Sequence, residues 1–318
     1  KHYIVSADAH CTVDAFWLYE LVNTMLDQQG DLGTSNYYYN PVDFEQRPNL
    51  FREIQKTLRL REFSFSLFGG FPDGKGFGVE RSLYDAVGGI EIFYQLNNGR
   101  FVEHLSDDWD FGIKVIAYGG KPVYARHAYV EINSRRVDTI LDEVINGIAY
   151  GKDGIIIMKD VRPDVEQQKT VLADATPAEA KLAWDYSVKD YTPKNILLPV
   201  LLNPYLLLEN SEVRDFFSGP LADRLYRRIH ELKHEMRIID FKPIHAYKTP
   251  AYRLYLEFRD ALFAAMRRAV GDDIGFPPAL PTCFDAVNDE DFSRFVYYFC
   301  EDRESGEAHN YFGNGGVF

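Results

Sequence analysis

The sequence predicts an α/β protein, because strand-like and helix-like segments alternate over roughly its first 135 residues. Of its 318 residues, 46% are apolar and 26% are charged, a balance that excludes a disordered or collagen-like chain. Beyond about residue 137, longer amphipathic helices replace the alternation. We therefore expect an α/β part over residues 1–136 and a mainly helical region over residues 137–318.

Apolar spacing and glycine stop signals define the elements of the first part. Phe51, Ile54, Leu58 and Phe65 recur at helical spacing, for example, and Gly88-Gly89 ends a short helix. In chain order we expect a strand over His2–Ala7, a helix over Ala15–Leu26 with Asp14 as N-cap, a loop over Asp27–Asn49, a helix over Phe51–Phe68, a glycine-rich turn over Gly69–Gly78, a short helix over Ser82–Val87, a helix over Asp107–Tyr118 capped by Ser106, and one or two strands within Lys121–Ile132.

The second part is expected to be mainly helical. The segment 154–158 fits either a strand or the start of a buried helix. The expected helices cover Val137–Tyr150, Asp174–Tyr186, Ser211–Met236 and Ala251–Val270. The role of this region stays open: it covers an active site, selects an acceptor or forms oligomers. The oligomeric state is not predicted.

Charge and composition exclude several classes of partner. The net charge of −13 and the absence of a basic cluster argue against nucleic acid. No uncharged apolar run reaches the roughly 18 residues of a spanning helix, so no membrane span is expected. Three cysteines do not make a disulfide framework, and no signal peptide is evident. These features favour a reducing, cytoplasmic location.

Asp8 and His10 are the first candidate site residues, at the end of the opening strand. In a strand, residues two apart point to the same side, so both side chains would project together. A carboxylate and an imidazole suit Mn²⁺ or another divalent ion. The alternative, in which Asp8 is a turn residue and His10 is structural, stays open.

The acidic run Asp107, Asp108 and Asp110 is the second candidate. Acids in the first turn of a helix complement its dipole, which is the structural alternative. Three acids exceed what a cap needs, and crowded carboxylates raise one another's pKa, which suits a general base.

Glycine-rich turns on either side of residues 79–87 are the third candidate, because backbone can approach a ligand closely there. Gly76-Phe-Gly78 lacks the Gly-Lys-Ser/Thr of a P-loop and the third glycine of a dinucleotide fingerprint.

The order of these motifs resembles the second half of a family 2 glycosyltransferase domain of the GT-A fold. The Asp-x-His motif followed by Cys11 is similar to that of the polypeptide N-acetylgalactosaminyltransferases. Arg-Ser-Leu-Tyr-Asp-Ala-Val-Gly-Gly-Ile from Arg81 resembles the acceptor-side segment of the family. Ser-Asp-Asp-Trp-Asp from Ser106 resembles the Glu-Asp-x-Asp helix of the family. Gly-Lys-Pro follows this helix and ends at Pro122. The resemblance covers roughly residues 2–135.

The resemblance implies a metal-dependent transfer of a sugar from a nucleotide-sugar donor, with UDP favoured, to an acceptor hydroxyl. Asp8 and His10 would hold Mn²⁺ or Mg²⁺ at the donor diphosphate. Asp108 would be the general base of an inverting reaction, beside Asp107 in the place of the usual Glu. Arg81, Gly88, Gly89 and Trp109 would line the substrates. A third metal ligand is left open between His127 and Glu131.

Two departures from the family accompany the resemblance. The nucleotide-binding half that should precede the metal strand is reduced to seven residues, so the chain is expected to be a fragment. The Gln/Arg-x-x-Arg-Trp motif of processive synthases is absent, since Arg135-Arg136 is not followed by Trp. Two alternatives remain: a nucleotidyltransferase-like enzyme, and a non-catalytic binding or scaffold module that keeps a glycosyltransferase shell.

Overall fold

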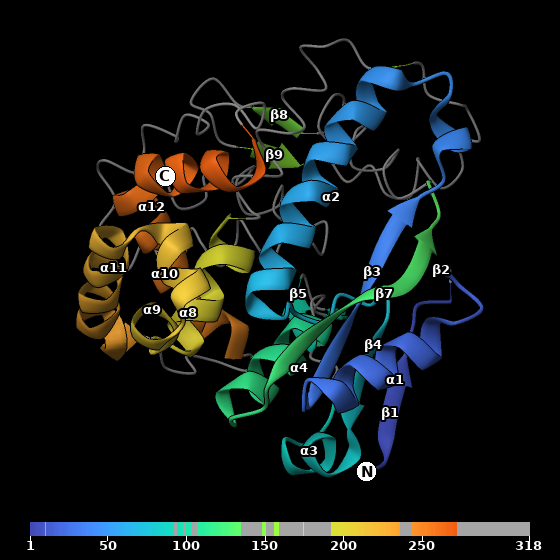
Figure 1. Ribbon diagram of the computed structural model, residues 1–318, viewed down its shortest axis with the longest axis horizontal. Helices are drawn as coiled ribbons and strands as arrows, with labels where there is room; N and C mark the ends of the chain where they lie inside the picture. Colours follow the sequence, from blue (N-terminus) through green and yellow to red (C-terminus); the bar gives the residue numbers. More distant parts are fainter. Residues whose placement is uncertain are drawn as a thin grey trace.

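A mixed, curled sheet with helices on both faces, and a helical region beside it, form the computed structural model of the chain (Figure 1). The structure describes residues 1–9, 11–91, 94–97, 100–103, 107–134, 148–150, 156–158, 174, 192–235 and 243–271. This architecture confirms the expected α/β class.

The main sheet has the strand order β1-β4-β3-β7-β2. Its strands are β1 (Tyr3–Ser6), β2 (Cys11–Val13), β3 (Leu32–Tyr39), β4 (Phe77–Glu80) and β7 (Pro122–Ile132). β3 and β7 are parallel, and all other neighbours are antiparallel. β1, β3 and β7 therefore run in the same direction, and their carboxyl ends share one end of the sheet. β1 and β2 form opposite edges, although only residues 7–10 separate them.

One face of the sheet is covered by α1 (Trp17–Asp27). Its buried residues Trp17, Leu21 and Met25 are four positions apart, so they form a single stripe against β7. β3 contributes Gly33 beneath this helix, where a Cβ would lie 2.7 Å from the Met25 side chain. The small residue lets the helix lie close to the sheet.

The other face of the sheet is covered by α2 (Pro48–Phe68), α3 (Arg81–Ala86) and α4 (Asp107–Ala117). Phe111 and Val115 of α4 are fully buried against strand residues that include Leu32 and Val79. Phe65 of α2 packs edge-to-face on Tyr124 of β7. The first turn of α2 is capped from far along the chain, because the Asp174 carboxylate accepts hydrogen bonds from the N–H groups of residues 49 and 50.

Helices that follow residue 192 pack beside α2 and α4 (Figure 1). They are a π-helical turn η3 (Pro193–Leu197), α8 (Leu198–Leu202), α9 (Leu206–Glu209), α10 (Ser211–Phe217), α11 (Gly219–Glu231), a 3₁₀ turn η4 (Leu232–Glu235) and α12 (Pro243–Val270). Their apolar core also takes in Leu60 and Phe68 of α2. α2 therefore contributes to two apolar cores, one between this helix and the sheet and one in the helical region.

The remaining described elements are short. They are a 3₁₀ turn η1 (Pro41–Phe44) and two hairpins, β5 (Tyr94–Asn97) with β6 (Arg100–Glu103) and β8 (Ile148–Tyr150) with β9 (Ile156–Met158). Among the described residues, no helix is both long enough and apolar enough to cross a membrane.

The largest correction concerns β3, because the loop expected over Asp27–Asn49 contains this central strand. Its sequence begins Leu-Gly-Thr-Ser-Asn, which carries few apolar side chains. Its polar side chains are satisfied inside the protein: the Thr34 hydroxyl donates to the Gly69 carbonyl at 2.7 Å, and Ser35 Oγ accepts from the Trp17 indole at 2.8 Å. Hydrogen bonds therefore offset the cost of burying these residues.

Smaller corrections concern helix ends. Asp14 is not the N-cap of α1; Phe16 holds that place, without a side-chain cap. The helix expected over Ser211–Met236 is broken at Ser218, because Pro220 lacks an N–H and starts a new helix. The last residues of the helix expected over Val137–Tyr150 form β8, and 156–158 form a strand. Apart from Asp174, the helix expected over Asp174–Tyr186 lies outside the described residues.

Candidate functional site

Asp8 lies at the carboxyl end of β1, where open α/β sheets commonly place ligands. Its N–H donates to the Gly74 carbonyl at 2.8 Å, and its carbonyl accepts from the Cys11 N–H at 3.0 Å. Because β1 ends at Ser6, the strand alternation expected to aim Asp8 and His10 together does not extend to Asp8. His10 itself lies outside the described residues.

The turn that holds Asp8 spans residues 69–76, between α2 and β4, and we call it the glycine turn. Gly74 has a φ of 71°, and a Cβ there would lie 2.7 Å from Asp8 Oδ2. A larger residue at this position would strain the backbone and displace the carboxylate. The missing side chain of Gly74 is therefore the space that the Asp8 carboxylate occupies.

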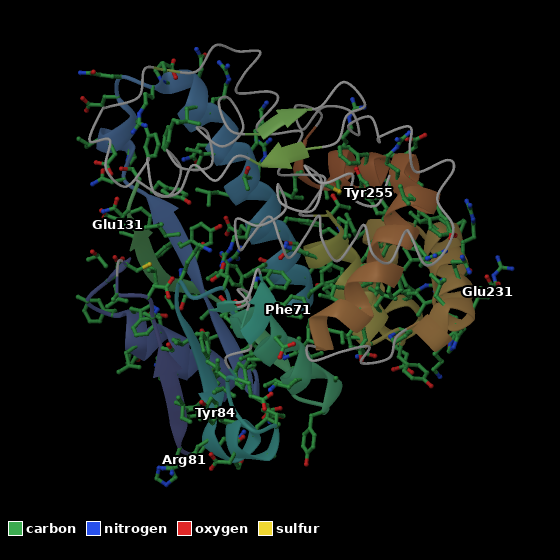
Figure 2. All side chains as sticks on the ribbon, turned by 180° about the vertical axis from the view of Figure 1, so that it is seen from behind. Phe71, Arg81, Tyr84, Glu131, Glu231 and Tyr255 are labelled. Carbon is green, nitrogen blue, oxygen red and sulfur yellow. The ribbon has the colours of Figure 1, made fainter. Side chains whose placement is uncertain are left out.

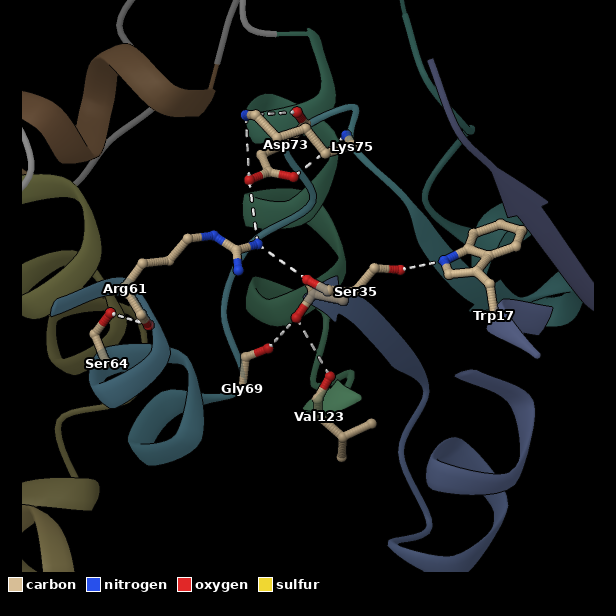
Figure 3. Close-up of polar contacts among 9 residues, drawn as sticks. Trp17, Ser35, Arg61, Ser64, Gly69, Asp73, Lys75 and Val123 are labelled. Carbon is tan, nitrogen blue, oxygen red and sulfur yellow. Dashed lines mark hydrogen bonds and ion pairs between the residues drawn. The ribbon is translucent and has the colours of Figure 1, made fainter. Parts of the chain in front are cut away.

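Three charged side chains anchor the glycine turn (Figure 3). Arg61 of α2 is only 3% exposed, and its Nη2 donates to the Ser35 carbonyl at 3.0 Å and contacts Asp73 Oδ2 at 3.4 Å. Lys75 Nζ lies 3.4 Å from the same carboxylate oxygen. The other oxygen, Asp73 Oδ1, accepts from the Lys75 N–H at 3.3 Å. The carboxylate of Asp73 thus joins two cations and the backbone of the turn.

The electrostatics of this cluster keep its groups ionised despite burial. Burial by itself would raise the pKa of Asp73, but the neighbouring Lys75 and Arg61 outweigh it and lower the pKa below its ordinary value. Burial would likewise lower the pKa of Lys75, and Asp73 and the nearby tyrosines raise it instead. The Arg61 guanidinium also lies 4.0 Å from the ring centres of Tyr37 and Phe65.

The other end of the glycine turn contacts the start of α4. Phe71 stacks on Trp109, with ring centres 4.7 Å apart and an angle of 21° between the planes. In Figure 2, Phe71 lies in the middle of the molecule, between the sheet and the helical region. Lys194 Nζ of η3 lies 6.0 Å from the Trp109 ring centre. The helical region therefore reaches the residue that follows Asp108.

The acids of α4 occupy different environments. Asp108 is half-buried, and its Oδ1 accepts from the Trp109 N–H at 2.7 Å. Asp110 is 1% exposed. The side chain of Asp107 is not among those described. Of the two acids in this run whose side chains are described, Asp108 is the one with partial access to solvent.

Arg81, Gly88 and Gly89 are not brought to the glycine turn. Arg81 begins α3, at the far end of β4, and pairs with Asp85 across one helical turn at 3.7 Å. Figure 2 shows Arg81 and Tyr84 at the outer end of the molecule, away from Phe71. Gly88 and Gly89 follow α3, and the Gly89 carbonyl accepts from Lys114 Nζ at 3.2 Å, near the end of α4. Three predicted substrate residues thus lie apart from Asp8.

The two candidates for a third metal ligand both lie on β7 but differ in setting. The pairing of β3 with β7 shifts after Ser35, so that residues 126–128 bulge out, and His127 in this bulge is exposed. Glu131 lies farther along β7, where it pairs with Thr12 of β2. Its Oε2 accepts a hydrogen bond from the Tyr38 hydroxyl at 3.2 Å. Within the described ranges, no group of three or more His, Cys, Asp and Glu side chains is arranged to hold a metal ion.

Arg61, Asp73 and Lys75 were not anticipated from the sequence. One signal was available, because Arg61 falls within the apolar stripe of α2. A charged residue on the buried face of a helix indicates either that the face is wrongly assigned or that the charge has a partner inside the protein. Asp73 and Lys75 stand in a glycine-rich segment whose polar residues gave no sign of burial.

Comparison with known proteins identifies no family for this chain. No family model matches the sequence, and neither a curated protein nor a solved structure matches it significantly.

Proposed function

We propose that this chain carries the metal- and acceptor-binding half of a GT-A glycosyltransferase, which transfers a sugar from a nucleotide-sugar donor to a hydroxyl group. The observation that carries the proposal is the glycine turn, because it contacts both Asp8 and Trp109, the neighbour of Asp108. Phe71 and Gly74 are three residues apart, a span of at most about 11 Å. The turn therefore joins the two acidic motifs that the family resemblance singles out.

The position of β1 is compatible with this proposal. β1 is an edge strand, and β4 is its one neighbour among the strands that the structure describes. A nucleotide-binding half of the expected kind would continue the sheet beyond β1. The donor nucleotide would then lie over the carboxyl ends of the strands, on the side of Asp8.

In the proposed reaction, the acceptor oxygen attacks the anomeric carbon of the donor sugar, and the bond from that carbon to the diphosphate oxygen breaks. Asp108 takes the proton of the acceptor hydroxyl on a carboxylate oxygen, which makes the reaction inverting. Trp109 follows this acid in the sequence, and its ring is stacked on Phe71. Asp107, which precedes Asp108 in the sequence, stands in the place of the Glu of the family motif.

A divalent ion, Mn²⁺ or Mg²⁺, would neutralise charge on the leaving diphosphate when bound. The donor chemistry of Asp8 and His10 fits such an ion, since a carboxylate and an imidazole are ligands of borderline metals. Asp8 is seated by the glycine turn at the sheet end, as described above. The remaining ligands would come from the diphosphate and water.

The proposal is tested by assaying the protein, expressed from its complete reading frame, for sugar transfer or donor hydrolysis with UDP-sugars and Mn²⁺. We expect activity that is lost in Asp108→Asn and is sensitive to chelator. Asp27→Asn, at an exposed acid that ends α1 and lies outside these motifs, is the control and keeps activity. Activity that persists in Asp108→Asn would refute the assigned role.

Two other outcomes identify the alternatives. Release of pyrophosphate from a nucleoside triphosphate and a sugar phosphate would indicate a nucleotidyltransferase. Absence of Mn²⁺ and UDP binding in calorimetry would indicate a binding or scaffold module.

A further inference from the structure

A pocket of about 350 Å³, open to solvent, lies where α2, α10 and α12 meet, on the opposite side of α2 from the sheet. This volume is within the range of small-molecule sites, about 300–1,000 Å³. None of its lining residues belongs to the candidate site around Asp8 and Asp108. We call it the three-helix cavity.

The floor of the three-helix cavity is apolar and aromatic. Phe63 of α2 and Phe216 of α10 lie with ring centres 5.1 Å apart at an angle of 54°, and Leu67 extends the floor. The wall from α12 carries Ala265 and Ala269, one helical turn apart. Because both side chains are small, this stretch of α12 leaves the space open.

The rim of the cavity is charged. Glu212 and Asp215 are exposed and three residues apart on α10, so they share one face of the helix. In the part of the chain that the structure describes, neither carboxylate has a recorded hydrogen bond or ion pair. Arg268 of α12 donates from Nη2 to the Phe216 carbonyl at 3.3 Å. Two carboxylates and one guanidinium give the rim a net charge of −1.

We propose that the three-helix cavity binds a small organic ammonium ion with an aromatic or branched apolar body. The body would pack on Phe63, Leu67 and Phe216, and the ammonium group would donate to Glu212 and Asp215. An ammonium near phenyl ring faces also gains cation–π attraction. This site is independent of the proposed glycosyl transfer, because the two share no residue.

The probe for this site is 2-phenylethylammonium, with 2-phenylethanol as its uncharged counterpart of similar shape. Calorimetry on the full chain should give an affinity for the ammonium about tenfold above that for the alcohol, the size of one charge-assisted hydrogen bond. Methyl-labelled NMR should show the largest shifts at Leu67, Ala265 and Ala269. Equal affinities for the two probes, or shifts at other methyl groups, would overturn the proposal.

Variants separate the charge from the cavity. Glu212→Gln with Asp215→Asn should remove the roughly tenfold preference while weak binding of the alcohol continues. Ala269→Phe should fill the cavity and abolish binding of both probes. Ala264→Phe, at an exposed position of the same helix outside the lining, should keep binding unchanged. Retention of the preference in the double variant would refute the assignment of the carboxylates.

Discussion

The glycine turn is partly buried and the core of the helical region is fully buried, and different contacts hold them. The turn is fixed by the ionised cluster of Arg61, Asp73 and Lys75. The core around α10, α11 and α12 consists of apolar side chains, among them Leu225 and Leu254, which are fully buried. Hydrogen bonds and ion pairs depend on direction, whereas apolar packing depends mainly on area and shape. The turn is therefore built to fix the place of particular atoms, including those that seat Asp8.

Asp73→Ala has the largest expected effect on stability. This change leaves the Arg61 guanidinium, which is 3% exposed, without the Asp73 carboxylate. We expect the free energy of unfolding to fall by about 3–5 kcal/mol, as for other buried ion pairs that lose one partner. Urea denaturation followed by circular dichroism measures the change. Asp223→Ala, which breaks the more exposed pair with Arg214, is the matched control and should cost less than about 1 kcal/mol. Similar losses in the two variants would contradict the role of burial.

Leu225→Ala tests the apolar side of the comparison. The side chain is fully buried in the helical core, so its removal loses transfer free energy and leaves a cavity. We expect a loss of about 3 kcal/mol in the same denaturation experiment. The geometry of the glycine turn should stay unchanged, because no directional contact is removed. NMR shifts of the Gly74 and Asp8 amides that move as much as in Asp73→Ala would contradict this separation.

Gly74→Ala changes the shape of the glycine turn without changing its charge. The residue would be forced into the left-handed region, and its Cβ would lie 2.7 Å from the Asp8 carboxylate. Gly88→Ala is the matched control, with a φ of 82° and no atom within 4 Å of the added Cβ. We expect a cost of about 1 kcal/mol for the control and roughly 2 kcal/mol for Gly74→Ala, from thermal or urea unfolding. Equal losses of unfolding free energy in the two variants would show that the Asp8 carboxylate moves away from the added Cβ without cost.

Tyr38→Phe extends the comparison to a partly exposed polar contact and has the smallest expected effect. Burial, the nearby Asp14 and the hydrogen bond to Glu131 raise the pKa of Tyr38 to about 12. Since the pKa of the unfolded side chain is about 10, the folded state holds this proton more tightly. Its contribution to stability is complete below pH 10 and declines as the pH rises through 12.

The stability difference between wild type and Tyr38→Phe should therefore shrink between pH 10 and 12. Unfolding experiments across this range, with tyrosinate absorbance as a second measurement, check the effect. A difference that stays constant over the range would contradict the raised pKa.

The sequence predicted the elements whose pattern is regular. The stripe Phe51, Ile54, Leu58 and Phe65 located α2, and glycines marked the ends of α3 and α4. β3 was not predicted, because a central strand of small and polar residues shows no apolar alternation. Its burial depends on partners far away in the chain, which local spacing does not reveal.

The candidate site shows the same division. The carboxylates of Asp8 and Asp108 were found as local motifs, and the structure adds the glycine turn that joins their surroundings. The buried ion pairs could not be foreseen, since α2 supplies Arg61 and the turn supplies Asp73. Arg81 was grouped with the site because of its motif, and the length of β4 separates it from Asp8.

The short connection between β1 and β2 spans the two edges of the sheet, and the strands it joins pair with residues far away in the sequence. β2 pairs with β7, so that Cys11 lies opposite Ile132, a residue near the other end of the α/β part in the sequence. Contacts between distant residues form slowly, because the entropy lost on closing a long loop must first be overcome. The contacts that seat Asp8 share this property, because its N–H donates to the carbonyl of Gly74, far along the chain. Contacts of such high sequence separation are expected to slow the folding of the α/β part as a whole.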